Sequence, residues 1–99
     1  MSLQIAPDKV AVELFCKANH IVWMAFFGSV TTDRFTASSD VDVLVTFDPD
    51  HVPGLFAVAR MERELGDILG RKADLRTPED LSDLFRDLVL REAVVQYAA

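Results

Sequence analysis

A continuous run of seven apolar residues, Ile21–Phe27, most narrowly limits the folds open to this chain. The run has the length of a β-strand, ends at Gly28 and is far shorter than a membrane span. A strand without a polar side chain is typical of a sheet that is covered on both faces. We therefore expect Ile21–Phe27 to form a strand buried on both faces.

Two amphipathic helices are predicted on either side of the central part of the chain. The first begins near Pro7 and Asp8, and the second has Pro53 in its first turn and ends at Gly70. Apolar residues recur at spacings of three and four in both segments, which places them on one face of each helix. These residues are Ala11, Leu14, Phe15 and Ala18 in the first helix, and Val58, Met61, Leu65 and Ile68 in the second.

Two further strands are predicted, at Val41–Phe47 and at residues 71–76. The first of them ends at a turn formed by Asp48, Pro49 and Asp50. Successive side chains of a strand point to opposite faces. One face should carry Val41, Val43, Val45 and Phe47, and the other Asp40, Asp42, Leu44 and Thr46.

The C-terminal part of the chain is expected to contain a third helix. Thr77 and Pro78 are typical of a helix N-terminus, and Asp80 follows three places after the predicted cap. This helix should turn four side chains inward: Leu81, Leu84, Phe85 and Leu88. Residues 94–97 fit either a last short strand or the end of that helix. Because helices alternate with strands, we predict an α/β or α+β fold with helices packed on a sheet.

Length and composition indicate one small domain that covers residues 1–99, without linker or repeat. A hydrophobic content of 51% is high for this size, which would leave apolar surface for a partner or a homodimer contact. The net charge of −6 opposes the counterion release that drives nucleic-acid binding, so direct binding to DNA or RNA is not expected.

The expected location is the cytoplasm. Cys16 is the only cysteine, so an internal disulfide is excluded and a reducing compartment is favoured. Residues 1–4 lack the start of a signal peptide, and no apolar run is long enough to span a membrane. We therefore expect no association with a membrane.

Gly28 and Ser29 follow the first predicted strand directly. Glycine lets the backbone approach a phosphate closely, and a helical turn from Ser29 would direct N–H groups and a hydroxyl at an anion. An ordinary turn contains the same two residues, and the Lys-Ser/Thr of a Walker P-loop is missing. The pair gains weight only in combination with other residues.

Asp40 and Asp42 open the second predicted strand and share one of its faces, roughly 7 Å apart. Two adjacent carboxylates repel each other, so the pair fits a ligand set for Mg²⁺ or another hard divalent cation. A pair of solvated carboxylates at a strand entrance is the alternative. An EF-hand loop is excluded because Leu44 occupies the position of an oxygen ligand.

A zinc site is not expected, because Cys16, His20 and His51 do not complete a ligand set. We interpret them as a core thiol and two surface imidazoles. Asp74 lies in the third predicted strand, between Ala73 and Leu75. That strand could bring one more carboxylate beside the metal pair, where it would accept the proton of an attacking hydroxyl.

The combination of Gly-Ser, Asp-x-Asp and a later strand Asp resembles the nucleotidyltransferase superfamily that includes DNA polymerase β. The resemblance is closest to its minimal prokaryotic branch, the MntA type, and covers nearly the whole chain. It rests on residues 27–29, 39–45, 70–78 and 86–97. The resemblance implies a small mixed β-sheet flanked by helices.

The resemblance also implies roles for particular residues. In the family, the residues that match Gly28 and Ser29 hold the triphosphate. The residues that match Asp40, Asp42 and Asp74 form the acidic triad, of which the first two bind Mg²⁺.

This chain departs from the family after Ser29. Many members carry a small-Arg-Gly stretch there, whereas the chain has Val30-Thr31-Thr32-Asp33-Arg34-Phe35. Either Arg34 turns toward the triphosphate, or the affinity for nucleotide is lower.

Two classes of function follow. The first is Mg²⁺-dependent nucleotidyl transfer, and the resemblance to the MntA type implies an antitoxin that uses ATP to attach AMP to a tyrosine of a HEPN-family toxin. The alternative is a weak or inactive antitoxin that binds and masks its partner. Modification of an antibiotic would need a substrate-binding domain that 99 residues do not provide.

Overall fold

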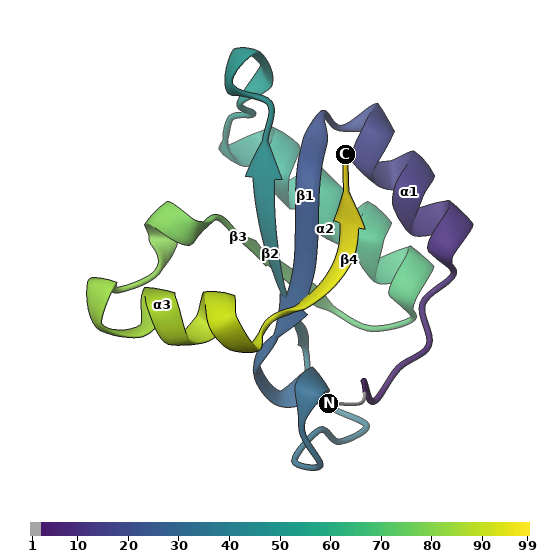
Figure 1. Cartoon of the computed structure of the whole chain (residues 1–99). Helices are drawn as coiled ribbons and strands as arrows, with labels where there is room; N and C mark the ends of the chain where they lie inside the picture. Colours follow the sequence, from purple (N-terminus) through teal and green to yellow (C-terminus); the bar gives the residue numbers. More distant parts are fainter. Residues whose placement is uncertain (1–2) are drawn as a thin grey trace.

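The apolar run Ile21–Phe27 forms β1, an inner strand of a four-stranded sheet with the order β3-β2-β1-β4 (Figure 1). The structure is a computed structural model that describes residues 3–99. β2 (Val41–Phe47) and β4 (Val94–Ala98) both run antiparallel to β1. β3 (Ala73–Arg76) runs parallel to β2, so the sheet is mixed. The predicted mixed sheet flanked by helices is thus confirmed.

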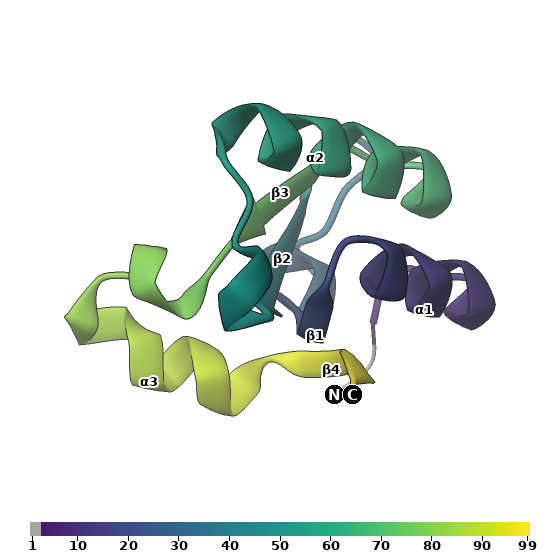
Figure 2. The ribbon, with the colours of Figure 1, turned by 90° about the horizontal axis from the view of Figure 1, so that it is seen from above.

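Two helices, α1 (Lys9–Ala18) and α2 (Leu55–Leu69), pack on the same face of the sheet, and α3 (Asp83–Glu92) lies on the other side (Figure 2). α1 begins after Asp8, whose Oδ1 accepts hydrogen bonds from the N–H groups of Val10 and Ala11. α2 ends at Gly70, which has a left-handed φ of 71°. Among the helices of residues 3–99, none reaches the length and hydropathy of a membrane-spanning helix.

The hydrophobic core lies between the sheet and the two helices α1 and α2. β2 points its valines into this core, and α2 contributes Met61 and Leu65, as the alternation and the helical spacing predict. The buried core residues are Val12, Phe15, Cys16, Ile21, Met24, Phe26, Val30, Val41, Val43, Val45, Phe47, Met61, Leu65, Ala73 and Leu75. Asp42 therefore lies on the opposite face of β2, the face on which α3 is found.

Two predictions about burial were partly wrong. In α1 the buried side chains are Val12, Phe15 and Cys16, whereas Leu14 is 61% exposed, because the sheet covers a face turned away from the predicted stripe. In β1 the first residue, Ile21, and the residues from Met24 to Phe26 are buried, but Val22 is exposed and Trp23 is only partly buried. α2 begins at Leu55, slightly later than predicted, since Gly54 is its N-cap.

The C-terminal prediction needs a correction. Thr77 does form a capping box with Asp80, but the turn that follows is a 3₁₀-helix at Pro78–Asp80 and not the start of α3. Ser82 caps α3 instead, and its side chain accepts from the N–H of Leu84. No residue of α3 is buried, so its apolar side chains do not turn inward as predicted. The open alternative for residues 94–97 is settled in favour of a strand, β4.

Candidate active site

Two of the predicted acidic residues lie side by side in the sheet. Asp42 on β2 is the direct neighbour of Asp74 on β3 in the parallel register. On its other side Asp42 is paired with Phe27, the last residue of β1, which Gly28 follows. Asp74 and Asp42, which we call the acidic row, thus lie next to each other and next to the turn at Gly28, although these residues are far apart in the chain.

Gly28 is in contact distance of the Asp42 carboxylate. It has a φ of 76°, a left-handed conformation that side chains disfavour. A Cβ at this position would overlap Oδ2 of Asp42 and would lie 3.3 Å from its Cγ. Any other residue would therefore push the turn and the carboxylate apart.

The surroundings of Asp42 disfavour its negative charge. The pKa of Asp42 is raised above its ordinary value, first by partial burial and next by the charge of Asp74, with a smaller contribution from Asp40. Arg76 opposes this shift. Partly buried carboxylates that repel each other are an arrangement that a divalent cation would stabilise.

Asp40, the third of the predicted acidic residues, lies at the edge of the acidic row. Its Oδ2 is 3.9 Å from Nζ of Lys72, in a loose ion pair at the surface. Among residues 3–99, no three His, Cys, Asp or Glu side chains are grouped closely enough to enclose a metal ion. The carboxylates fit a cation that completes its coordination with substrate oxygens and water, as Mg²⁺ commonly does with phosphates.

A cleft of about 230 Å³ opens beside the glycine turn. Gly28, Ser29 and Arg34 all line it, so the residues predicted to hold the triphosphate share one cavity. A volume of about 230 Å³ is smaller than most small-molecule sites, so the cleft encloses only part of a nucleotide. Its other lining residues are Phe27, Thr31, Thr32, Leu88, Val89 and Glu92.

Side-chain hydrogen bonds hold the glycine turn in shape. Residues Gly28–Thr31 form a short 3₁₀-helix, as the predicted turn after the strand suggested. Thr31 Oγ1 donates to the carbonyl of Gly28 at 2.8 Å, and Thr32 Oγ1 donates to that of Ser29 at 3.0 Å. The Oγ1 of Thr32 also accepts from the N–H of Arg34. The threonines therefore connect the turn to Arg34.

Arg71 fastens the loop between Arg34 and Asp40. Its Nη1 donates to the carbonyl of Thr36 at 2.7 Å and to that of Ser39 at 3.2 Å. The guanidinium also lies 4.4 Å from the centre of the Phe35 ring, a cation–π contact. Arg71 thus ties the loop that carries two predicted site residues to the segment leading into β3.

Leu88, Val89 and Glu92 of α3 form one wall of the cleft. Residues 86–97 are part of the family resemblance, but sequence reasoning gave these three residues no role in the site, because only the packing of the folded chain brings them to the glycine turn. The threonines of the turn were visible in the sequence but carried no assignment. Their hydroxyls, two and three residues after Ser29, were the available signal.

A larger cleft, of about 670 Å³, lies away from the acidic row, along α2 and residues 70–73. Its charged lining includes Glu62, Arg63 and Asp67. Glu62 accepts from the N–H of Leu75 at 2.8 Å and so protects the open edge of β3. None of the predicted site residues lines this larger cleft.

The residues rejected as zinc ligands lie apart from the acidic row. Cys16 is buried, and burial raises the pKa of its thiol to about 12, which makes it unreactive. His20 and His51 are exposed, and their rings stack with centroids 3.9 Å apart. The interpretation as a core thiol and two surface imidazoles is confirmed.

The fold and the acidic row define a nucleotidyltransferase, and comparison with known proteins gives the same class. The family model of the nucleotidyltransferase domain matches residues 9–96. The chain belongs to the nucleotidyltransferase domain family. The predicted resemblance to this superfamily and to its minimal members is therefore confirmed.

Individual relatives support this assignment. The "putative protein adenylyltransferase MJ0435" of Methanocaldococcus jannaschii is 33% identical over 70 residues, which are 71% of this chain and 73% of the relative. A solved structure described as a "putative minimal nucleotidyltransferase" is 32% identical, has a TM-score of 0.71, and is matched over 87% of this chain and 86% of its own.

Two solved complexes share the fold at low sequence identity. A toxin-antitoxin structure with AMP-PNP has a TM-score of 0.74 at 16% identity, over 93% of this chain and 74% of its own. The complex of the tri-AMPylated Shewanella oneidensis HEPN toxin with its MNT antitoxin has a TM-score of 0.66 at 15% identity, over 92% of this chain and 70% of its own.

Proposed function

We propose that this nucleotidyltransferase moves AMP from ATP to a hydroxyl of a partner protein with the help of Mg²⁺. The observation that carries the proposal is the contact between the glycine turn and the acidic row. Gly28 approaches Asp42 more closely than any other residue could, and Asp42 is beside Asp74. A triphosphate on the turn and a cation on the carboxylates would then be neighbours.

The predicted site residues would have two roles, binding of the triphosphate and binding of Mg²⁺. Gly28, Ser29 and Arg34 would bind the triphosphate in the cleft that they line. Asp40, Asp42 and Asp74 would hold Mg²⁺, which lowers the pKa of an acceptor hydroxyl and neutralises charge on the phosphates.

The transfer itself is an in-line displacement at the α-phosphorus of ATP. The acceptor oxygen forms the new bond to phosphorus, and the bond to pyrophosphate breaks. Asp74 would accept the proton that the hydroxyl loses. Because Asp74 pairs with Asp42 in the sheet, the residue that would accept this proton lies next to a residue that would hold Mg²⁺.

The acceptor that we propose is a tyrosine of a HEPN-family toxin. A relative with 33% identity is named a "putative protein adenylyltransferase", and a solved complex with the same fold holds an AMPylated HEPN toxin. Adenylylation of a tyrosine adds a bulky charged group, which would block a toxin whose active surface lies nearby.

A catalytically silent antitoxin is the second candidate. The segment after Ser29 favours it, because Asp33 adds a negative charge next to Arg34, close to where phosphates would bind. Such a protein would neutralise its partner by covering it.

Mass spectrometry separates the two candidates. The chain is incubated with ATP, Mg²⁺ and a HEPN-family toxin of the same organism, and the intact mass of that toxin is measured. The proposal predicts an increase by one or more adenylyl groups, absent with Asp42→Asn. Inhibition of the toxin at unchanged mass would favour the silent antitoxin.

A further inference from the structure

α3 presents an apolar face that no element of the described chain covers. Leu84 and Phe85 are 86% and 58% exposed, and Leu88 is 45% exposed. Because Leu88 follows Phe85 by three positions and Leu84 by four, the three side chains lie on one side of the helix. Contacts between α3 and the other elements are sparse, and Figures 1 and 2 show the helix extending away from the sheet.

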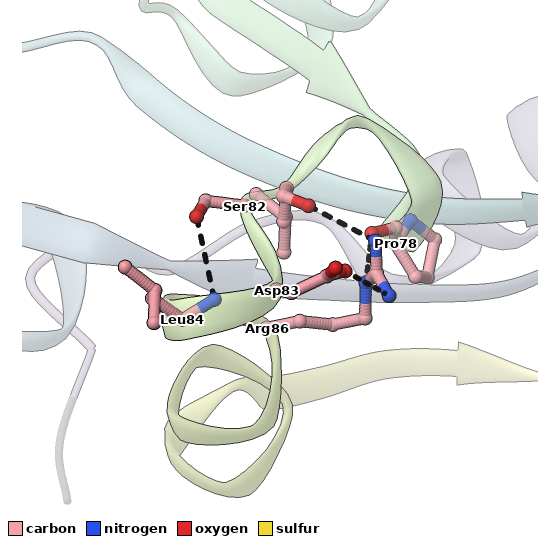
Figure 3. A network of polar contacts seen from close by, with 6 residues as sticks. Pro78, Ser82, Asp83, Leu84 and Arg86 are labelled. Atoms are coloured by element: carbon pink, nitrogen blue, oxygen red, sulfur yellow. Dashed lines mark hydrogen bonds and ion pairs between the residues drawn. The ribbon is translucent and has the colours of Figure 1, made fainter.

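Polar contacts hold α3 in place where apolar packing is missing (Figure 3). Arg86 donates from Nε to the carbonyl of Pro78 at 2.7 Å and from Nη2 to that of Leu81 at 3.0 Å. Its Nη1 also forms an ion pair with Asp83 at 3.0 Å. At the other end α3 leads directly into β4, which pairs with β1. The helix is thus fixed at both ends while its apolar side stays free.

The apolar face is continuous with the candidate active site. Leu88 belongs to the exposed face and also lines the cleft together with Gly28 and Ser29. Val89 and Glu92 extend this wall of the cleft. A molecule that brings a hydroxyl into the cleft beside the glycine turn would therefore lie next to α3.

The charge around this face indicates what kind of surface it would bind. Residues 79–92 contain five acidic and two basic residues, and Arg86 is already engaged within the segment. A second copy of the chain would bring like charges against each other. A partner with basic residues around an apolar patch would complement this surface instead.

We propose that the exposed face of α3, formed by Leu84, Phe85 and Leu88, is the docking surface for the acceptor protein. This inference rests on the proposed function. The acceptor protein covers the three apolar side chains with an apolar patch, and basic residues around that patch meet the acidic side chains of α3. Docking there directs its hydroxyl into the cleft next to Gly28.

The test measures complex formation and adenylyl transfer separately. Binding to the same HEPN-family toxin is measured by calorimetry without ATP, so the result does not depend on catalysis. The double variant Leu84→Ser with Phe85→Ser should weaken binding about tenfold or more. The matched control is Leu14→Ser, an exposed leucine on α1 at the opposite face of the sheet, which should stay within about twofold of wild type.

Charge is tested with Asp87→Lys, which reverses an exposed acid next to Leu88. It should slow association and reduce the dependence of the association rate on salt. An unchanged rate and an unchanged salt dependence would contradict a basic partner surface.

The outcomes are distinguishable from those of the proposed function. If the wild-type chain binds but transfers no AMP while the double variant fails to bind, the docking surface stands and the proposed function fails. Wild-type affinity of the double variant, or a wild-type chain that does not bind, would overturn the docking surface. So would a homodimer in sedimentation that the double variant dissociates.

Discussion

At the scale of single residues, the backbone conformation at Gly28 and the position of the Asp42 carboxylate depend on each other. The left-handed turn at Gly28 places backbone where a side chain would overlap the Asp42 carboxylate. That carboxylate in turn is partly buried beside Asp74. The sequence predicted these residues and the approach of Asp74 to the aspartate pair. It did not predict the close contact between Gly28 and the Asp42 carboxylate, because that contact depends on the register between β1 and β2.

Gly28→Ala should cost more stability than Gly70→Ala. Both glycines have a positive φ near 70°, so both variants lose about 1–2 kcal/mol through left-handed strain. Only at position 28 does the new Cβ also meet another residue, since nothing lies within 4 Å of a Cβ at position 70. Urea denaturation of both variants measures the difference. Equal losses would show that Asp42 does not approach the turn.

Asp42→Asn should slightly raise the thermal stability of the metal-free protein at pH 7. Because the folded pKa of Asp42 is raised, the wild type gains stability from its protonated form at low pH and loses it as pH rises through that pKa. The asparagine has no charge to lose, so the two melting temperatures should converge below the ordinary Asp pKa of 3.8. Thermal melts between pH 3 and pH 7 test this. A variant that is less stable than wild type at pH 7 would contradict it.

At the scale of elements, the loops between helices and strands position predicted site residues as much as the helices and strands do. The loop after Arg34 has no regular structure over most of its length, yet Arg71 holds it through two carbonyls and the Phe35 ring. Capping and turn residues predicted most element ends correctly. Burial was harder to predict, since periodicity shows that a helix has an apolar side but not what covers it.

Arg71→Lys should weaken ATP binding without unfolding the protein. Lysine keeps the charge but cannot present a planar guanidinium to the Thr36 and Ser39 carbonyls, so the loop would loosen at a cost of about 1 kcal/mol. We expect KM for ATP to rise severalfold with a smaller change in kcat. Steady-state kinetics measure both, with Arg63→Lys on α2 as the control. A change confined to stability would show that Arg71 is purely structural.

α3 shows most clearly why local patterns were not sufficient. Its leucines and Phe85 have the spacing of a core helix, which the sequence analysis took as inward burial. In the structure an arginine network and the link to β4 hold the helix, and its apolar side faces outward beside the cleft. The sequence alone does not distinguish a core helix from one whose apolar side stays uncovered.

At the scale of the whole molecule, the mixed sheet brings distant segments together at one end of its strands. β2 lies between β1 and β3, so the turn after β1 and the acid on β3 both border Asp42. The alternation of helices and strands predicted the class of fold, and the three motifs predicted the residues. The strand order that joins them becomes visible only in the folded chain.

The most direct test of this account is calorimetric titration with ATP, with and without Mg²⁺, of the wild type and of Asp42→Asn and Asp74→Asn. We predict that Mg²⁺ strengthens ATP binding by the wild type and that both variants lose most of this gain, because in our proposal the acidic row would hold the cation. ATP affinity that is the same with and without Mg²⁺ in the wild type, or a Mg²⁺ effect that survives in both variants, would contradict the assignment of this row as the metal and nucleotide site.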